Sequence, residues 1–289
     1  MEYINPYSHS TRWLRGNIHL HQFCGGHFDL GASGHMFKLL HYDFIAVTDH
    51  NQAHSAPAIE QWARQAGLVI VPGEENGQTD HIIELGVHEV TPTPSDDYVE
   101  RARALRAAGG FVMGCHPQEY PHGEENIHRA ADELHAVEIF NALREGRGTD
   151  EARNIRLWDE LLTAGKRIWA VAADDFHAVY VGPGQGWVGV QVPEDAEVTW
   201  PLIVEQLKRG AFYASTYPGF SSLTLADGIL RVVATRKTRS LRVIGPGGAV
   251  LAEYEGGELE WPVQSGLAYF RVEAVNGRKR GWSQPFFRA

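Results

Sequence analysis

Up to about residue 220, short apolar runs alternate with longer segments that have helical periodicity. The runs that we interpret as strands are 16–21, 44–50, 68–75, 111–117, 136–141, 167–177, 186–192 and 211–216. The helical patterns between them are 34–42, 56–67, 98–110, 127–135, 149–165 and 200–210, with a further apolar run at 81–87. Strand, helix, strand in this order predicts parallel strands with crossover helices. About seven such units predict a closed α/β barrel.

The pattern changes at about Ser222, where helical periodicity ends and alternating strands punctuated by glycine begin. Residues 240–254, for example, place Gly-Pro-Gly-Gly between two strand patterns, which predicts a turn there. These strands predict a small β-sandwich. We therefore expect an α/β chain with a barrel over residues 1–221 and a C-terminal β-sandwich domain over residues 222–289.

Composition is ordinary for a globular protein, with 43% hydrophobic and 21% charged residues in a chain of 289. No run of about 18 apolar residues occurs and the N-terminal segment lacks the apolar core of a secretory signal, so we expect a cytoplasmic protein without a membrane partner. The two cysteines, Cys24 and Cys115, exclude a disulfide framework and a thiolate zinc site. A net charge of −10 argues against duplex nucleic acid as a partner and favours a small-molecule substrate.

The unusual feature of the composition is its 15 histidines, many of them beside Asp or Glu at the ends of predicted strands. His19 and His21 are two positions apart, so along a strand their side chains point to the same face. Further strand ends carry Asp49, His50, Glu74, Glu75, His116, Glu138, Asp174, Asp175 and His177. Because functional residues of an α/β barrel cluster at the C-terminal ends of its strands, we expect these side chains to form a metal centre there.

The motifs NIHLH, TDHN, GEE, CHP, VEIFN and DDFH, in this order, resemble the PHP (polymerase and histidinol phosphatase) superfamily of metal-dependent hydrolases. The stretches that begin GEENGQTDH and VEIFNALREGRG, and the closing GWSQPFF, are especially similar to its carbaryl-hydrolase-like branch. The resemblance implies a distorted (β/α)7 barrel that holds two or three divalent metal ions. Ligands of the types His, Asp and Glu accept zinc, manganese or iron, and the sequence does not select among them.

Carried over residue by residue, the resemblance assigns ligands to each metal. The first metal takes His19, His21, Glu75 and Asp175, the second shares Glu75 and adds His81 and His116, and the third takes His27, His50 and His177. Glu75 is the expected bridge, rather than Glu74, because the family pattern places its carboxylate two residues after the glycine, here Gly73. His27 fills a place near the Asp that many relatives carry, and Asp29 is a second candidate for that place.

Two groups of residues have no clear counterpart in the family motifs. Asp174 stands where relatives tend to have a small hydroxyl residue, and we weigh a role in the metal centre against a solvated loop carboxylate. The histidines that match no motif are interpreted as surface residues, and they are His9, His35, His41, His54, His88, His122, His128 and His135.

A bound metal can lower the pKa of water from about 15.7 to about 7, so we predict hydrolysis by a metal-bound hydroxide. The residues expected to act in catalysis are Glu75, Asp175, His50 and Arg144. Arg144, with Asn141 and Arg147 in the same loop, can bind a substrate anion, which favours a phosphoesterase acting on a small phosphate ester. A carbamate, ester or amide hydrolase on the same metal cluster is the alternative. A non-catalytic metal-binding scaffold is a third hypothesis, which the completeness of the ligand set disfavours.

Overall fold

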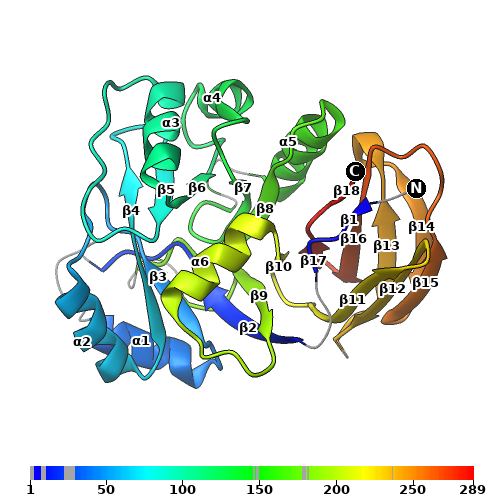
Figure 1. Cartoon of the computed structure of the whole chain (residues 1–289), viewed down its shortest axis with the longest axis horizontal. Coiled ribbons are helices and arrows are strands. Elements are labelled where there is room, and N and C mark those ends of the chain that lie inside the picture. Colours follow the sequence, from blue (N-terminus) through cyan, green and yellow to red (C-terminus); the bar gives the residue numbers. More distant parts are fainter. Residues whose placement is uncertain are drawn as a thin grey trace.

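The computed structural model describes residues 3–7, 11–22, 30–145, 147, 150–177, 180, 182–235 and 237–289. A curled sheet with helices around it lies beside a group of C-terminal strands (Figure 1). The helices are α1 (Leu30–Leu39), α2 (Ala56–Ala66), α3 (Tyr98–Ala108), α4 (Gly123–Ala130), α5 (Glu151–Thr163) and α6 (Trp200–Arg209), with a short 3₁₀ helix at Pro246–Gly248.

The strands of the first part are β1 (Tyr3–Ile4), β2 (Thr11–Asn17), β3 (Phe44–Val47), β4 (Val69–Asn76), β5 (Ile82–Leu85), β6 (Phe111–Gly114), β7 (Ala136–Asn141), β8 (Trp169–Ala173), β9 (Trp187–Pro193) and β10 (Phe212–Ser215). Those of the C-terminal part are β11 (Phe220–Ala226), β12 (Ile229–Ala234), β13 (Ser240–Ile244), β14 (Val250–Glu255), β15 (Glu258–Pro262), β16 (Tyr269–Asn276), β17 (Lys279–Ser283) and β18 (Phe286–Arg288).

One long sheet runs through both parts in the order β1-β18-β16-β17-β10-β9-β2-β3-β4-β5-β6-β7-β8, with β13 and β14 attached beside β16. The pairs β2·β3, β3·β4, β6·β7 and β7·β8 are parallel, as predicted. Strand β5 is antiparallel to both of its neighbours, and β9 is antiparallel to β2 and β10. The architecture is therefore mixed α/β, and the predicted count of seven strand–helix units is not confirmed.

The direction of β5 follows from the length of its connection to β4. Only residues 77–81 separate the two strands, and a parallel crossover needs about a dozen residues or more. Gly77 and Asp80 both have positive φ values, of 116° and 49°, which turn the chain back on itself within this short loop. The apolar run at 81–87 therefore adds an antiparallel strand and not a further β/α unit.

The curl of the sheet brings its distant strands together at one end. Beyond β2 and β8 the chain forms a parallel bridge between Leu20 and Phe176, in which His21 N donates to Phe176 O at 3.0 Å and Phe176 N donates to His19 O at 3.2 Å. The chain segments that follow β2 and β8 are thus hydrogen-bonded neighbours, although they lie more than 150 residues apart in sequence.

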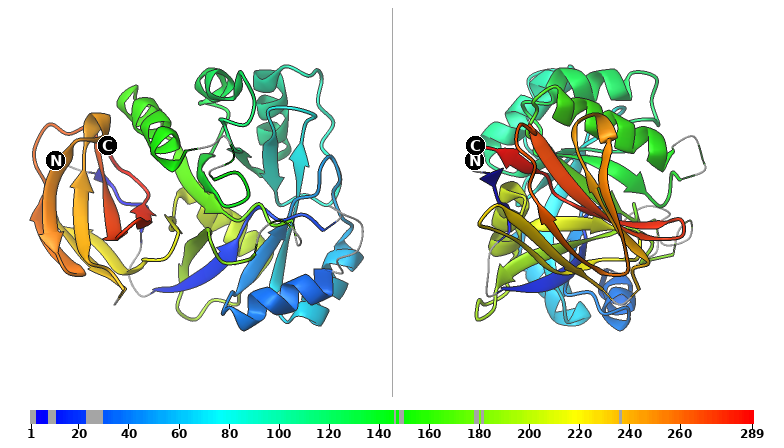
Figure 2. Two further views of the ribbon diagram at one scale, coloured as in Figure 1. Left: turned by 180° about the vertical axis from the view of Figure 1, so that it is seen from behind. Right: turned by 90° about the vertical axis from the view of Figure 1, so that its right-hand side faces the viewer.

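Alternation along the strands separates an inner core from an outer one. On β3, Phe44 and Ala46 pack in a cluster shared by strands from β2 round to β10 and by α6, whereas Ile45 and Val47 pack against α1 and α2. Helices α3, α4 and α5 cover the outer face of β6 to β8 in the same way, and the reverse view shows them along one side of the curl (Figure 2). Strands buried on both faces explain the near-continuous apolar runs in the sequence.

The C-terminal strands dock on the curled sheet through buried polar contacts. The Gln284 amide pairs with the backbone of Ala170, accepting from its N at 2.9 Å and donating to its O at 2.8 Å. Arg271 of β16 is 1% exposed and forms two hydrogen bonds with Asp159 of α5, at 3.0 and 2.9 Å, and one with Glu273 at 2.7 Å. The segment from β16 to β18 therefore joins the two parts by side-chain contacts as well as by the shared sheet.

The predicted division after residue 221 falls inside β11, and β1 of the N-terminal segment pairs with β18. The division into two domains stays a prediction. Strands β11, β12 and β15 form a separate sheet that faces the other C-terminal strands. None of the six described helices has the length and apolar character needed to cross a bilayer.

Replacing Asp159 by alanine is expected to destabilise the protein by about 3–5 kcal/mol, because the fully buried guanidinium of Arg271 loses one of its two carboxylate partners. Urea denaturation followed by circular dichroism measures the change. Arg231→Ala is the control, since it breaks an ion pair with Glu260 in which the side chains are 48% and 60% exposed and should change stability by about 1 kcal/mol or less. Equal effects of the two substitutions would contradict the prediction.

Candidate metal centre

The strands that build the inner core also carry the candidate ligands to its end. Val71 of β4 packs in the inner cluster, and Glu75, four residues further along the same strand, faces the same side. Ala173 at the end of β8 packs in that cluster as well, two residues before Asp175. The period of two along β4 thus places Glu75 inside the curl, whereas Asp175 lies just beyond the end of β8, on the segment that follows the inner cluster.

The first strand ends earlier than predicted. Strand β2 stops at Asn17, and the next residues continue through the isolated bridge at Leu20. His19 and His21 flank that bridge residue and turn to the same side, where both lie close to Glu75. The prediction that the two imidazoles share a face is confirmed, although they follow the strand and do not lie within it.

Glu75 is the centre of the cluster and its side chain is 1% exposed. Around Oε1 lie His81 Nδ1 at 2.9 Å, His116 Nε2 at 3.0 Å and His19 Nε2 at 3.5 Å, and around Oε2 lie His50 Nδ1 at 3.0 Å and His21 Nε2 at 3.1 Å. Each carboxylate oxygen therefore faces its own set of imidazoles.

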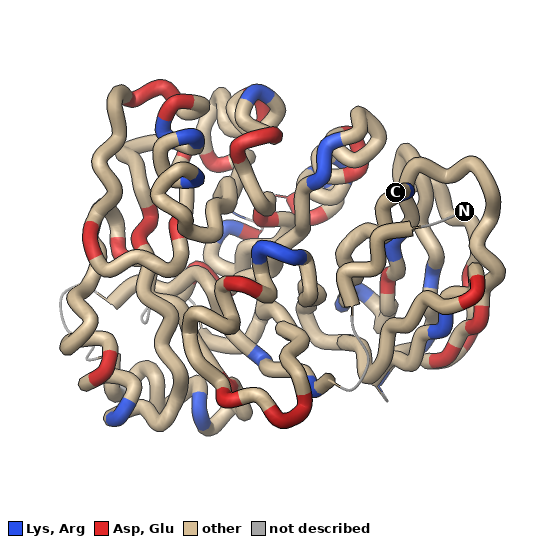
Figure 3. The backbone as a smooth tube through the Cα atoms, in the orientation of Figure 1, with Lys and Arg blue, Asp and Glu red and all other residues tan. Residues whose placement is uncertain are grey.

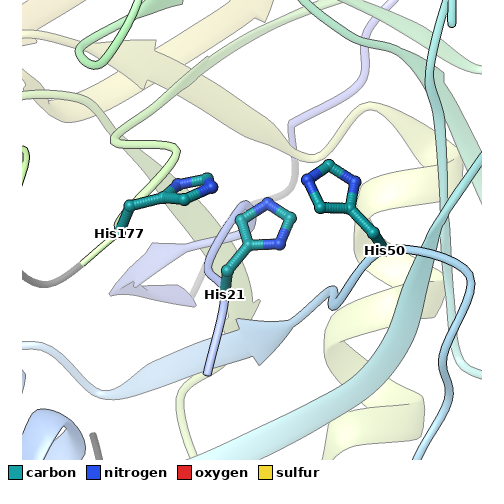
Figure 4. A group of neighbouring side chains, drawn as sticks. All are labelled: His21, His50 and His177. Carbon is teal, nitrogen blue, oxygen red and sulfur yellow. The ribbon is translucent and has the colours of Figure 1, made fainter. Parts of the chain in front are cut away.

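Asp175 forms a second acidic point in the same cluster. Its Oδ1 lies 3.1 Å from His177 Nδ1, 3.2 Å from His19 Nε2 and 3.4 Å from His21 Nε2. The rings of His21, His50 and His177 face one another across a small space (Figure 4), and the ring centroid of His21 lies 4.5 Å from that of His50 and 4.3 Å from that of His177.

Four groups of residues could each hold a metal ion. Within each group, the donor atoms, one from each residue, lie within 4.8 Å of one another. The groups are His19, His21 and Asp175; His19, Glu75 and His116; His50, Glu75 and His81; and His21, His50 and His177. The structure thus brings together eight of the nine residues predicted as ligands. The ninth, His27, and the alternative Asp29 lie outside the described residues.

Several donor atoms of the cluster are close together but form no hydrogen bonds with one another, as expected of ligands that bind a cation. His19 Nε2, Glu75 Oε2 and Asp175 Oδ1 are buried and form no hydrogen bond within the described part of the chain, although Asp175 Oδ1 lies only 3.2 Å from His19 Nε2. Buried polar atoms without hydrogen bonds are rare and costly. Divalent cations placed between them would satisfy these atoms, and imidazole with carboxylate ligands suits zinc, manganese or iron.

The charges of the cluster shift the pKa values of its members in opposite directions. Burial lowers the pKa of His19, but Asp175, Glu75 and Glu138 outweigh burial and raise it to about 9. Burial raises the pKa of Glu75 and of Asp175, but His19 and other imidazoles hold both values well below the usual range. For His50 burial prevails and lowers the pKa to about 4, so this imidazole is neutral at pH 7.

The backbone is strained at two of the candidate ligands. His116 has φ of 25° and Asp175 has φ of 49°, values that are uncommon for residues with a Cβ. Such conformations persist only where the surroundings hold them, and they concentrate at functional sites. Each residue lies two positions after the end of a strand. The turn there directs His116 toward Glu75 and Asp175 toward His19.

Glu138 contacts two of the candidate ligands, His19 and His116. It is 0% exposed, its Oε1 lies 3.0 Å from His19 Nδ1, and its Oε2 accepts from His116 N at 2.8 Å. Asn141 donates to Glu138 at 2.8 Å and to Asp175 at 3.1 Å. A metal-binding histidine usually donates its other ring N–H to such a carboxylate. The amide group of Asn141 is used inside the protein, and its expected contact with a substrate anion stays a prediction.

Two residues of the site have partners that the sequence analysis did not find. His54 was expected at the surface, but it is 7% exposed and its Nε2 lies 2.7 Å from Asp49 Oδ2. Glu119 Oε2 lies 2.9 Å from His116 Nδ1. The spacing of three residues in CHPQE is the only signal in the sequence for the second contact, and a turn is needed to interpret it.

Other predicted residues have mixed outcomes. Asp174 is no solvated loop carboxylate: it is 0% exposed and accepts hydrogen bonds from the backbone N of Gly184, Gln185 and Gly186 and from Asn17 Nδ2. Of the histidines expected at the surface, those that are exposed are His35, His41, His122 and His128, those that are half-buried are His88 and His135, and His9 lies outside the described residues.

No protein-family model matches the chain, and no curated protein is similar to it in sequence. Among solved structures it is similar to a two-domain protein from Bacteroides vulgatus that contains a predicted PHP-like metal-dependent phosphoesterase, with 13% identity over 100% of this chain and 90% of that one and a TM-score of 0.54. The chain shares the fold of this two-domain protein.

Two further structures match a smaller share of the chain. A candidate metal-dependent phosphoesterase from Bifidobacterium adolescentis has 14% identity over 68% of this chain and 96% of that one, with a TM-score of 0.47. An amidohydrolase from Chromobacterium violaceum, with bound sulfate and no metal, has 12% identity over 66% of this chain and 96% of that one, with a TM-score of 0.45.

Binding of a divalent ion to the metal-free protein is expected to release protons at pH 7. His19, with a pKa of about 9, carries a proton that the ion must displace, so affinity should increase as the pH rises toward 9 and decrease as it falls. Calorimetric titration with Zn²⁺ or Mn²⁺ in buffers of different ionisation enthalpy measures the release. His122→Ala, at a side chain that is 74% exposed, is the control. Identical binding heats in every buffer would rule out this account.

Proposed function

We propose that the chain is a metal-dependent hydrolase of the PHP type that cleaves a small phosphate ester. The arrangement of Glu75 carries this proposal, because its two oxygens face different sets of imidazoles within one buried cluster. A carboxylate placed in this way can bridge two divalent ions, and paired ions are typical of enzymes that hydrolyse phosphate and acyl bonds. The shared fold with a protein described as a predicted PHP-like metal-dependent phosphoesterase is in keeping with it.

We propose that the donor set would hold two or three divalent ions, with Glu75 as the ligand that two of them would share. Asp175, His19 and His21 would hold the first ion, and His81 with His116 would hold the second, as the resemblance implies. His27, His50 and His177 would hold the third; His50 and His177 form a group with His21 in the structure, and His27 lies outside the described residues.

The ions, when bound, supply the hydrolytic chemistry, since a divalent metal lowers the pKa of a bound water and polarises the bond to be cleaved. The protein's own part is to hold the ligands in place. Glu138 fixes the ring of His19, and the charge of Glu75 balances the cations. His50 is neutral at pH 7 and its side chain is 38% exposed, which places it at the open side of the cluster.

Arg144 is the residue that we propose to bind the phosphate group. Its side chain is 30% exposed and its Nε lies 3.6 Å from Asp175 Oδ2, so Arg144 is beside the candidate ligands and partly open to solvent. Arg147 is exposed and is the weaker candidate of the two.

The alternative is a carbamate, ester or amide hydrolase on the same metal cluster, and one observation favours it. Arg144 NH1 forms a 2.8 Å ion pair with Glu119, so part of its charge is already neutralised within the protein. A substrate without charge needs no free arginine. The similarity of the closing GWSQPFF and neighbouring motifs to the carbaryl-hydrolase-like branch belongs with this alternative.

A small-molecule substrate is also proposed in preference to nucleic acid. The net charge is −10, and Lys and Arg positions are interspersed with Asp and Glu positions along the chain (Figure 3). Binding of duplex nucleic acid depends on a concentration of positive charge on one face.

Glu75→Gln is expected to remove the bridge and to lower both metal content and hydrolysis, the latter at least about a hundredfold, since residues that merely orient metal ligands already contribute 10–100-fold. Elemental analysis after reconstitution and assays with chromogenic phosphate esters measure the two effects. Glu74→Gln is the matched control, because Glu74 is equally buried but faces away and accepts from Thr91 N at 3.0 Å. Full metal content and turnover in Glu75→Gln would show that the bridge is misassigned.

Arg144→Ala is expected to lower kcat/KM for a phosphate ester about tenfold, equivalent to about 1.4 kcal/mol, and to leave the hydrolysis of a neutral aryl ester or carbamate nearly unchanged. Arg129→Ala, which removes an exposed arginine paired with Asp97, is the control. If the metal-reconstituted wild type hydrolyses only the neutral substrates, the phosphoesterase proposal fails and the alternative replaces it.

A further inference from the structure

The loop that follows β6 holds a carboxylate between a candidate metal ligand and the candidate substrate-binding arginine. Glu119 Oε2 lies 2.9 Å from His116 Nδ1, a close polar contact that is not aligned as a hydrogen bond, and Glu119 Oε1 lies 2.8 Å from Arg144 Nη1. The Glu119 side chain is only 18% exposed and that of His116 is 1% exposed. A single side chain therefore contacts both the nitrogen of His116 that faces away from Glu75 and the guanidinium beside Asp175.

The loop itself is fixed in this position. Glu119 N donates to His116 O at 2.9 Å, which closes a turn and keeps the carboxylate close to the imidazole. The neighbouring Gln118 is held at the start of α5, donating to Asp150 O at 3.2 Å and accepting from Asp150 N at 3.0 Å. Hydrogen bonds to His116 and to Asp150 thus hold the loop that carries Glu119.

We propose that Glu119 is a positioning residue that orients His116 for metal binding with one oxygen and restrains Arg144 with the other, so that an anionic substrate competes with Glu119 for Arg144. This inference rests on the proposed metal-dependent function. His116 Nδ1 lies against Glu119 at 2.9 Å, and its Nε2 is the nitrogen that faces Glu75, 3.0 Å from Glu75 Oε1. Carboxylates that fix a ligand histidine in this way contribute to metal affinity.

The chain contains a matched pair without this role. His122 and Glu125 have the same spacing of three residues, but their side chains are 74% and 70% exposed and the contact is longer, at 3.4 Å. Glu125 is far less buried than Glu119, and its partner is not one of the candidate metal ligands. Substitution of Glu125 therefore measures the effect of losing a similar His–Glu contact at the surface.

The test compares Glu119→Ala, Glu119→Gln and the control Glu125→Ala in two equilibrium measurements. The first is the affinity of the metal-free full chain for Mn²⁺ or Zn²⁺, which Glu119→Ala should weaken 10- to 100-fold. Glu119→Gln should recover most of this loss, because its amide oxygen can still accept from His116 Nδ1. Glu125→Ala should leave the affinity unchanged.

The second measurement is the affinity for inorganic phosphate at saturating metal. Both Glu119 substitutions should tighten phosphate binding by up to about fivefold, the range of a partly exposed ion pair. The gain should vanish when Arg144→Gln is added, because the competition acts through that arginine. Wild-type metal affinity in Glu119→Ala, or a gain in phosphate affinity that persists without Arg144, would overturn the inference. A wild type that binds no metal would overturn the proposed function itself, whereas normal wild-type binding with unresponsive variants defeats this inference alone.

Discussion

The structure depends on the need to compensate one buried negative charge. The Glu75 carboxylate is shielded from water at the end of β4, and a charge in such a place is stable only with partners of opposite charge or with a metal. Five imidazole nitrogens among the described residues supply the contacts, and they come from segments scattered between residues 19 and 116. The sheet must curl for these segments to meet around one carboxylate.

The curl in turn requires support on the side where the sheet remains open. Among the described residues, strand β8 has no partner strand other than β7 in the sheet order, and the Gln284 amide pairs with its residue Ala170. Arg271 and Asp159 tie the same C-terminal strands to α5. Helix α5 begins beside Gln118 and so beside the loop that carries Glu119. The C-terminal strands therefore help to hold the centre without contributing a candidate ligand.

Charge balance around the centre bears on the kind of substrate that it accepts. Glu75, Asp175 and Glu138 are buried carboxylates, while Arg144 is the arginine that reaches the cluster and is partly neutralised by Glu119. With ions bound, the cations and not the arginine would dominate the attraction of an anion. In the proposed chemistry, Arg144 would then add discrimination between phosphate esters and neutral esters to the attraction that the cations supply.

The candidate ligands were accessible from the sequence because two simple rules govern them. Side chains two or four positions apart on a strand share a face, which places Glu75 in line with Val71, and parallel strands end at a common edge. The ordered motifs around His19, His116 and Asp175 added the resemblance. These features depend on local periodicity, so they can be predicted without knowledge of how the segments pack.

What only the tertiary structure decided depends on turns and on contacts between distant segments. The direction of β5 followed from a short loop, and the burial of Asp174 and His54 followed from partners that lie close to them only after the chain has turned. The contact of Glu119 with both His116 and Arg144 likewise needs a turn after β6 and the approach of a loop from β7. Loop residues have no fixed period that tells which way a side chain points, so the sequence determined the chemistry of the donors and the fold determined how they are held.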